Sequence, residues 1–218
     1  MSMKNKKIAL FDLDGTLTNP SEGITKCVQY ALSRLGIEED RKNLLRFIGP
    51  PLTESFHDFY GLDEEKCHEA VLYYRERYSE KGIFENGLYP DTCKALELFK
   101  EKGLTLLVAT SKPEPFAIQI CEHYGIAKYF DHICGSGLDN LYYSKADIIR
   151  NALSYVSSYD REEIIMIGDR KHDILGAREF GIQTACVRCG FADPGELEEN
   201  GADYIEDSLL DIAKLINE

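Results

Sequence analysis

The chain has 218 residues, enough for one large domain or for a core that carries a modest insert. Apolar residues make up 44% and charged residues 29%, close to the averages of soluble globular proteins, which argues against a disordered or fibrous chain. The formal charge is -13, and no basic stripe offsets it in the sequence. Binding to nucleic acid polymers or anionic membranes through bulk charge is therefore disfavoured.

No apolar run approaches the roughly 18 residues that a membrane span needs, and residues 1–7 are polar and basic. We therefore expect a cytoplasmic protein. Seven cysteines, an odd number, lie mostly in apolar segments, as free thiols do in a reducing compartment. Cys186 and Cys189 form a CxxC pair, but no second pair stands at the spacing of a zinc site, so we expect no metal or redox use of it.

Short apolar runs alternate with amphipathic segments along most of the chain, a pattern typical of a parallel sheet with helices on both faces. The strands are predicted at residues 8–11, 104–109, 132–134, 164–167 and 184–188. Asp91 is expected to cap a helix that ends before Gly103, and a helix over 170–180 to end at Gly181. Each glycine suits the left-handed position that follows a helix.

Residues 12–103 separate the first two predicted strands, which is far more than one crossover needs. We predict that 18–86 form a helical insert and that 1–17 and 87–218 form the core. Ser21 is expected to cap one helix of the insert, and Asp63 another. The segment 47–52 contains two prolines and a glycine, so no helix should continue through it.

The first candidate site follows the first predicted strand. Asp12 and Asp14 end a buried strand, where their carboxylates would repel each other unless a cation neutralised them. Mg²⁺ fits, because it takes oxygen ligands and bridges to phosphate. Gly15 permits a sharp turn out of the sheet, and Thr16 offers a hydroxyl. An isolated Asp-x-Asp is more often an ordinary turn, but the strand before it and the Gly-Thr-Leu after it favour a site.

Two later segments bring polar groups to the same edge, where open α/β sheets bind ligands. Thr110 and Ser111 supply hydroxyls and Lys112 an ammonium at the end of the second strand, a weak signal taken alone. Lys145 begins a helix, where a cation opposes the macrodipole. Its position therefore suits an anion-binding site better than a structural role.

The last segment is Gly-Asp-Arg-Lys-His-Asp at 168–173, directly after a wholly apolar strand. If a helix begins straight after Asp169, then Asp169 and Asp173 face the same crevice, whereas the alternative makes them a helix cap and a surface residue. With the first pair, four carboxylates would meet at one edge of the sheet. Such a cluster requires a cation.

These four segments, in this order and with an insert after the first, resemble the haloacid dehalogenase superfamily of phosphotransferases over nearly the whole chain. The combination of Asp-x-Asp-Gly-Thr with a distant Gly-Asp-x-x-x-Asp is specific to it. The resemblance implies a Rossmann-like, doubly wound parallel sheet with an inserted α-helical cap of the first class. The segments 47–52 and 88–90 resemble those of phosphoglycolate phosphatases and the allied 5′-nucleotidase-like proteins.

The resemblance also implies residue roles. Asp12 would be the nucleophile that forms an aspartyl-phosphate, and Asp14 the general acid and base. Thr110 and Lys145 would bind the transferring phosphoryl oxygens. The residues expected at a magnesium ion are Asp12, Asp14 through its carbonyl, Asp169 and Asp173. The residues expected to bind substrate are Thr16, Ser111, Lys145, Arg46 and Gly49, of which Arg46 would contact a second anionic group.

The implied function is a magnesium-dependent phosphomonoesterase for a small phosphorylated metabolite, most like phosphoglycolate phosphatase. The alternatives are a 5′-nucleotidase-like phosphatase, a β-phosphoglucomutase-like phosphotransferase and a non-catalytic binding member. Ser111 replaces a common Asn, and 168–173 is more basic than usual, so the substrate stays open. Asp14 argues against a true dehalogenase, which protonates no phosphate leaving group. We expect a monomer or weak dimer.

Overall fold

The computed structural model describes residues 3–138 and 144–217 and divides into two compact units. One unit consists of Met1–Thr18 and Leu88–Glu218, and the other of Asn19–Gly87. We name them the sheet unit and the helical unit. The boundaries expected from the sequence, 17/18 and 86/87, lie one residue away from these.

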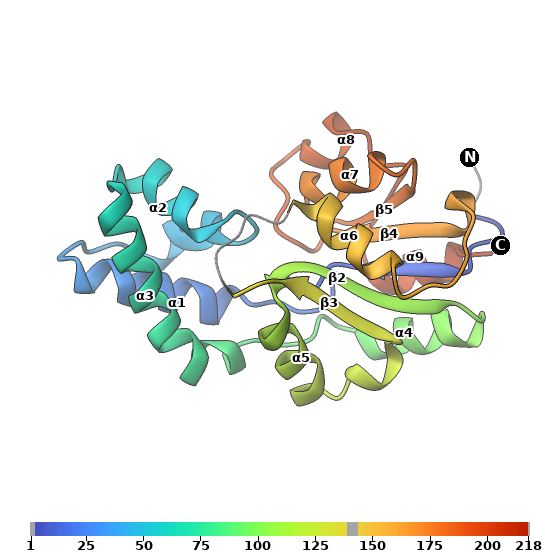
Figure 1. The fold of residues 1–218 in the computed structure, drawn as a ribbon, viewed down its shortest axis with the longest axis horizontal. Coiled ribbons are helices and arrows are strands. Elements are labelled where there is room, and N and C mark those ends of the chain that lie inside the picture. The colour runs from blue at the N-terminus through green and yellow to red at the C-terminus, as the bar shows by residue number, and fades with distance from the viewer. Residues whose placement is uncertain (1–2, 139–143, 218) are drawn as a thin grey trace. The chain divides into compact units, whose positions relative to one another are not determined.

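The described part of the sheet unit forms a six-stranded parallel sheet in the order β3-β2-β1-β4-β5-β6 (Figure 1). The strands are β1 (Ile8–Phe11), β2 (Thr105–Pro113), β3 (His132–Ser136), β4 (Ile164–Gly168), β5 (Gln183–Val187) and β6 (Tyr204–Glu206). The strand order reverses between β1 and β4, which confirms the doubly wound, Rossmann-like prediction. Ligands bind such sheets at this switch point, beyond the carboxyl ends of the strands.

Helices cover both faces of the sheet, so every residue of β1 is buried. The α-helices are α4 (Thr92–Glu101), α5 (Glu114–His123), α6 (Lys145–Leu153), α7 (Lys171–Arg178), α8 (Glu196–Glu199) and α9 (Leu209–Leu215), and two short 3₁₀ helices are η3 (Ala127–Tyr129) and η4 (Arg161–Glu163). In Figure 1, α6 and α7 lie on one side of the sheet and α4 and α5 on the other. Leu10 packs in the cluster under α6 and α7, while Phe11 packs edge-on against Phe99 of α4, 5.2 Å between ring centroids.

The glycines that were predicted to end helices do so. Gly103 has φ +81° and Gly181 φ +64°, both in the left-handed region where a side chain is disfavoured. The capping role predicted for Asp91 is wrong. Asp91 holds the N-cap position of α4, but its own φ of +61° turns the side chain away, and its carboxylate accepts from Lys94 Nζ at 2.7 Å instead of from a helix N–H.

The helical unit contains three α-helices and two short 3₁₀ helices among its described residues. They are α1 (Ser21–Arg34), η1 (Arg41–Phe47), α2 (Leu52–Tyr60), α3 (Glu64–Glu80) and η2 (Gly82–Phe84). Asp63 caps α3 as predicted, since its carboxylate accepts from Lys66 N at 2.9 Å. The Ser21 prediction is wrong, because Ser21 is the first residue of α1 and its N–H donates to Asn19 Oδ1 at 3.1 Å.

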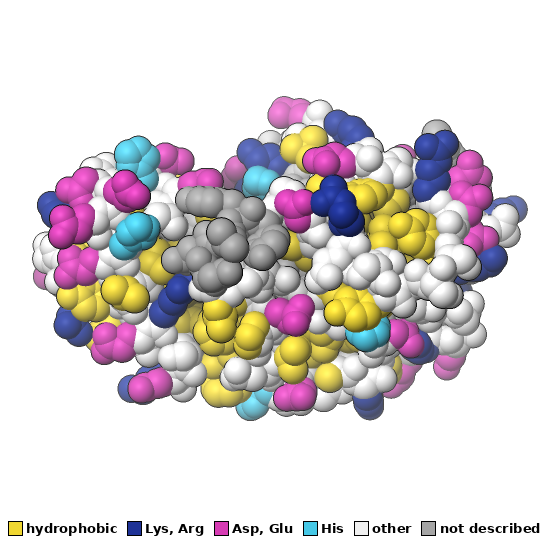
Figure 2. All heavy atoms as spheres, viewed as in Figure 1, with side chains coloured by type: hydrophobic (Ala, Val, Ile, Leu, Met, Phe, Trp, Pro, Cys, Tyr) yellow, Lys and Arg dark blue, Asp and Glu magenta, His cyan; other side chains and the backbone are white. Residues whose placement is uncertain are grey.

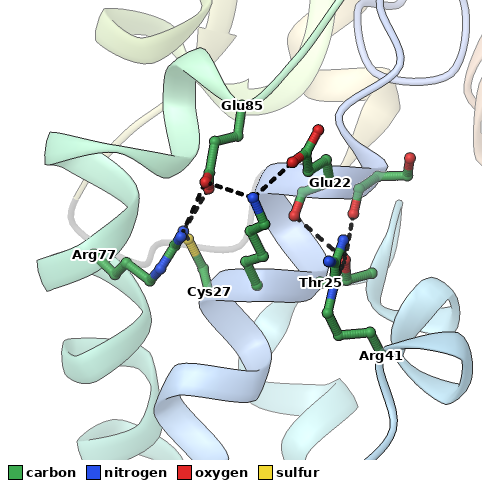
Figure 3. A network of polar contacts seen from close by, with 8 residues as sticks. Glu22, Thr25, Cys27, Arg41, Arg77 and Glu85 are labelled. Carbon is green, nitrogen blue, oxygen red and sulfur yellow. Dashed lines mark hydrogen bonds and ion pairs between the residues drawn. The ribbon is translucent and has the colours of Figure 1, made fainter.

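An ion-pair network fastens the end of the helical unit to α1 and α3 (Figure 3). Glu85 pairs with Arg77 of α3 at 2.6 Å and with Lys26 of α1 at 2.8 Å. The bond from Arg77, aided by Lys26, lowers the pKa of Glu85 to about 2. Arg77 Nη1 also donates to Cys27 Sγ at 3.2 Å. Glu85 therefore bridges two helices that the sequence places fifty residues apart.

The surface mixes charges of both signs. On the face drawn in Figure 2, Lys and Arg side chains lie scattered among Asp and Glu. Within residues 3–138 and 144–217, no helix has the length and apolar character needed to cross a bilayer. Cys186 is buried in β5 and Cys189 is exposed, and both are free thiols.

Candidate active site

The site is built at the carboxyl ends of the central strands. Phe11 of β1 lies beside Val108 of β2 and Ile167 of β4, so the residues that follow these positions emerge at one edge of the sheet. Asp12 follows β1, and Asp169 follows Gly168 at the end of β4. Thus segments more than 150 residues apart in the chain meet at the switch point.

Three carboxylates come together there. Oxygens of Asp12, Asp169 and Asp173 lie within 4.8 Å of one another, and all three residues are buried. Asp173 joins the cluster from the first turn of α7, four residues after Asp169. The sequence predicted that these side chains share one crevice, and the structure brings them together. Asp14 is placed differently, beside Lys112.

Lys145 is the cation of the cluster. It is the first residue of α6, whose start is fixed by reciprocal bonds between Ser144 and Asp147. Its Nζ lies 2.6 Å from Asp12 Oδ1 and 2.7 Å from Asp173 Oδ1, with only 4% of the side chain exposed. The macrodipole that disfavours a cation at this position is outweighed by two buried carboxylates.

Asp173 is held on both sides. Its Oδ2 accepts from the backbone N–H groups of Asp169 and Arg170, each at 3.1 Å, while Oδ1 faces Lys145. A Cβ at Gly168 would come within 2.2 Å of that same Oδ2. Glycine is therefore required at the end of β4 for the α7 carboxylate to reach the strand.

Asp169 is oriented by two donors. Thr16 Oγ1 donates to its Oδ1 at 3.2 Å, and Phe191 N–H donates to its Oδ2 at 2.8 Å. A Cβ at Gly15, which has φ +93°, or at Gly190 would lie 2.2–2.3 Å from the Asp169 side chain. The Thr16 hydroxyl, expected to bind substrate, is thus engaged in positioning a carboxylate.

The second aspartate of the first motif faces the end of β2. Lys112 Nζ lies 2.7 Å from Asp14 Oδ2, and both side chains are largely buried. Thr110 is also buried, and its Oγ1 accepts from Lys112 N at 3.3 Å. Ser111 is exposed, and its carbonyl accepts from Ser136 Oγ at 2.9 Å. Lys112 was noticed in the sequence only as part of its segment, although it forms an ion pair with Asp14.

The charges of the cluster do not balance. Three carboxylates against the one ammonium of Lys145 leave a formal charge of -2 when all are ionised. Burial raises the pKa of Asp12 to about 6 even though Lys145 opposes the shift. Burial, followed by the charges of Asp12 and Asp173, also raises the pKa of Asp169. One lysine is not enough to stabilise three buried carboxylates.

These groups could hold a divalent cation. The available donors are carboxylate oxygens from Asp12, Asp169 and Asp173, which suit a hard cation better than a soft one. A charge of +2 would cancel the surplus on the cluster. The donor chemistry and the charge therefore both fit such an ion.

Sequence reasoning missed a buried support for the α7 end of the site. Glu196 Oε1 accepts from Lys171 N at 2.7 Å and pairs with Arg170 Nε at 2.9 Å. This holds the first residues of α7, next to Asp169 and Asp173. Glu196 lies 25 residues further along the chain, so no local spacing connects it with this loop.

Two residues that were expected to bind substrate lie in the helical unit. Arg46 is exposed, with its guanidinium 4.2 Å from the Phe59 ring centroid and 5.5 Å from that of Tyr60. Gly49 is also exposed and has φ +106°, a turn conformation that suits glycine. Their roles toward a substrate stay predictions.

The model of the haloacid dehalogenase-like hydrolase family matches residues 9–187. The chain belongs to this family. A 5′-nucleotidase of Pseudomonas aeruginosa is 47% identical over 189 residues, 86% of this chain and 85% of that protein. The tyrosine-protein kinase PtkA of Mycobacterium tuberculosis is 36% identical over 86% of this chain and 64% of its own length. A phosphoglycolate phosphatase of Vibrio parahaemolyticus is 26% identical over 99% of this chain and 98% of that protein.

Solved structures agree with the family assignment. A Clostridium difficile protein, described with its crystal structure only as a candidate phosphatase, has a TM-score of 0.90 and 44% sequence identity. The match covers 98% of this chain and 99% of that one. The predicted superfamily is thus confirmed, and the protein is a haloacid dehalogenase-family hydrolase of the phosphatase type.

Proposed function

We propose that this chain is a magnesium-dependent phosphomonoesterase that works through an aspartyl-phosphate on Asp12. The observation that supports this most is the cluster of three buried carboxylates with a single lysine, at the switch point of the sheet. A cluster of this charge is costly without a ligand, and it suits a cation together with a phosphoryl group.

The first half of the reaction is assigned to the two aspartates of the first motif. A carboxylate oxygen of Asp12 attacks phosphorus, and the bond to the leaving oxygen breaks. Asp14 gives its proton to that oxygen, which departs as an alcohol. Lys145, 2.6 Å from Asp12, and the Thr110 hydroxyl then stabilise the negative charge on the phosphoryl oxygens.

The second half reverses the proton path. Asp14, now a carboxylate, takes a proton from a water molecule, whose oxygen attacks phosphorus. The bond between Asp12 and phosphorus breaks, which releases inorganic phosphate and restores the Asp12 carboxylate. Lys112 is within ion-pairing distance of Asp14 and holds it in place between the two steps.

Magnesium would be held by the side chains of Asp12 and Asp169 and by the Asp14 carbonyl, with Asp173 in support. When bound, it would neutralise charge on the cluster and on the phosphoryl group. Thr16 and Phe191 N–H keep Asp169 oriented for this role, as the outer hydrogen bonds of metal ligands commonly do.

Nucleoside 5′-monophosphates are the substrate class we favour, ahead of phosphoglycolate. The relative named 5′-nucleotidase is 47% identical, against 26% for the one named phosphoglycolate phosphatase. Ser111 in place of the Asn common in phosphoglycolate phosphatases, and the basic segment 168–173, point the same way.

The test is phosphate release from nucleoside monophosphates, phosphoglycolate, sugar phosphates and p-nitrophenyl phosphate, each with magnesium and with EDTA. We expect hydrolysis that needs the metal, with the highest kcat/KM on a nucleoside monophosphate. Acid quenching during turnover should trap one phosphoryl group on Asp12, detectable by peptide mass spectrometry. No hydrolysis of any of these esters would refute the proposal.

Phosphoryl transfer is a second candidate, favoured by the 36% identity to a protein named as a tyrosine kinase. In such a reaction a hydroxyl replaces water in the second step. The same assay separates the two, because transfer to an added acceptor lowers phosphate release relative to consumption of the ester.

Arg46 offers a further test of substrate class. If it contacts a carboxylate, Arg46→Ala should raise KM for phosphoglycolate several-fold and spare p-nitrophenyl phosphate, which has no second anion. Arg34→Ala is the matched control, because Arg34 makes a similar contact with the Tyr73 ring at 4.4 Å in the same unit. Equal losses on both esters would instead assign Arg46 to the fold of the helical unit.

A further inference from the structure

One buried polar atom stands out. Among residues 3–138 and 144–217, the hydroxyl of Tyr89 is the only buried side-chain N or O atom that has no hydrogen-bond partner. A buried hydroxyl without a partner costs stability, because it has given up its bonds to water and gained none. Such a group calls for a physical explanation.

The backbone around Tyr89 is fixed against the loop that carries the first motif. Tyr89 N–H donates to Leu17 O at 3.2 Å, and Thr92 N–H donates to Tyr89 O at 3.2 Å. Thr92 Oγ1 reaches the same Leu17 carbonyl at 3.2 Å. Tyr89 is therefore held in place from both sides.

The backbone of Tyr89 lies beside the loop of the first motif, because its N–H bonds to the carbonyl of Leu17, three residues after Asp14. Burial raises the pKa of Tyr89, and the charges of Cys189, Asp169 and Asp14 act in the same direction. The phenol O–H donates to none of these groups. Here the oxygens of Asp169 accept from Thr16 and Phe191, and Asp14 pairs with Lys112.

We propose that Tyr89 is a further binding residue of this site, whose hydroxyl donates a hydrogen bond to an oxygen of the ligand that these carboxylates bind. The inference rests on the proposed function, because that function supplies the oxygen: either a phosphoryl oxygen or a water of the magnesium hydration shell. On binding, the unpaired hydroxyl acquires its missing acceptor. The hydroxyl then lowers the stability of the free protein and contributes favourably to the stability of the ligand-bound protein.

This role differs from simple packing of the ring. A phenylalanine would fill the same space and bury no hydroxyl. If the hydroxyl serves the ligand, removing it should leave the free protein at least as stable while weakening ligand binding. If the Tyr89 ring only packs against its neighbours, the substitution should not combine undiminished stability of the free protein with weaker ligand binding.

The experiment compares Tyr89→Phe with Tyr129→Phe in the full chain. Tyr129 is a matched control, because it is a half-buried tyrosine of the same unit whose hydroxyl does have a partner, Glu97 Oε1 at 2.7 Å. Melting temperature is measured in EDTA, in a magnesium titration, and in an inorganic phosphate titration at saturating magnesium. KM and kcat for p-nitrophenyl phosphate complete the set.

For Tyr89→Phe we expect a melting temperature in EDTA equal to or above that of the wild type, and binding about tenfold weaker in at least one titration. Weaker magnesium binding would identify a hydration water as the acceptor, and weaker phosphate binding alone a phosphoryl oxygen. For Tyr129→Phe we expect a lower melting temperature in EDTA and unchanged binding.

Two results would overturn the proposal: unchanged binding in both titrations, or a lower melting temperature in EDTA with ligand shifts like those of the wild type. A wild type that hydrolyses no phosphomonoester would refute the proposed function instead. The magnesium and phosphate titrations still decide the role of Tyr89 in that case, because they measure binding without turnover.

Discussion

Two opposing influences act on the pKa of the Asp12 carboxylate. It is buried, which raises its pKa to about 6, yet it lies 2.6 Å from a lysine that favours its charged form. Near neutral pH the Asp12 carboxylate is therefore ionised and available as a nucleophile. Lys145 is positioned to stabilise the negative charge of an incoming phosphoryl group. The arrangement arises because Asp12 directly follows β1 and Lys145 begins α6 at the same edge of the sheet.

Replacing Asp12 by Asn tests the nucleophile. Asp12→Asn should retain less than about a hundredth of wild-type kcat, because an amide of the same shape does not attack phosphorus. The fold should persist, since the substitution removes one of the buried like charges. Phosphate release and circular dichroism melting measure the two effects, and Asp58→Asn, at an exposed position of α2, is the control. Activity well above that level would remove Asp12 from the chemistry.

The acid and base role of Asp14 predicts a dependence on the leaving group. Asp14→Asn should lower kcat by about 10²- to 10⁴-fold on alkyl phosphates, whose leaving oxygen needs a proton. Aryl phosphates with good leaving groups should lose less in the first step, because they depart with little protonation. Values of kcat/KM, which report the first step, give the comparison over a series of leaving-group pKa values. A loss in kcat/KM that is uniform across the series would contradict an acid role.

At the scale of elements, strands and strand-end motifs could be predicted, whereas contacts between distant elements could not. β1 is buried on both faces and therefore appears as an unbroken apolar run, and Gly168 with Asp169 marks the end of β4. By contrast, β6 has only three half-buried residues, too short and too polar to show a pattern. α2 begins directly after the prolines that were expected only to break a helix. Proline is compatible with a position just before a helix, so a proline pair can mark either the end of one helix or the start of the next.

The same distinction applies to the residues of the site: those marked by local sequence could be predicted, and those that depend on distant contacts could not. The carboxylates, Thr110 and Lys145 could be found because each lies near the end of a strand or in the first turn of a helix. Glu196 and the N–H of Phe191 could not, because they act through positions that only the β5 connection brings close.

The Glu85 bridge between α1 and α3 allows a prediction at this scale. The folded pKa of Glu85 is about 2, below its ordinary value of 4.5, so its contribution is present above pH 4.5 and is lost as pH falls toward 2. Since the side chain is partly exposed, we expect Glu85→Gln to cost about 1–2 kcal/mol at neutral pH. Urea unfolding at several pH values should show the gap to the wild type closing below pH 4.5. Glu76→Gln, whose carboxylate is 57% exposed and 3.9 Å from Arg34, is the control and should change little.

For the whole molecule, the acidic cluster couples the stability of the chain to pH and to metal. The folded pKa of Asp12 is about 6, against an ordinary value of 3.8, and that of Asp169 is raised in the same direction. Between pH 3.8 and pH 6 the folded state therefore binds more protons at Asp12 than the unfolded state does. The free energy of unfolding must then fall as pH rises. For Asp12 alone the loss is about 2–3 kcal/mol, complete once pH exceeds 6.

Magnesium should abolish this loss, because it stabilises the ionised cluster and binds only the folded chain. In EDTA we expect the melting temperature to fall by several degrees between pH 5 and pH 7, and saturating magnesium to restore it, most of all at pH 7. Asp169→Asn, with one carboxylate fewer, should show a flatter pH profile in EDTA and a smaller magnesium shift. Differential scanning calorimetry across this pH range measures all three quantities. A melting temperature that is the same with EDTA and with magnesium at pH 7 would contradict a cation site at the switch point, whatever the activity of the protein.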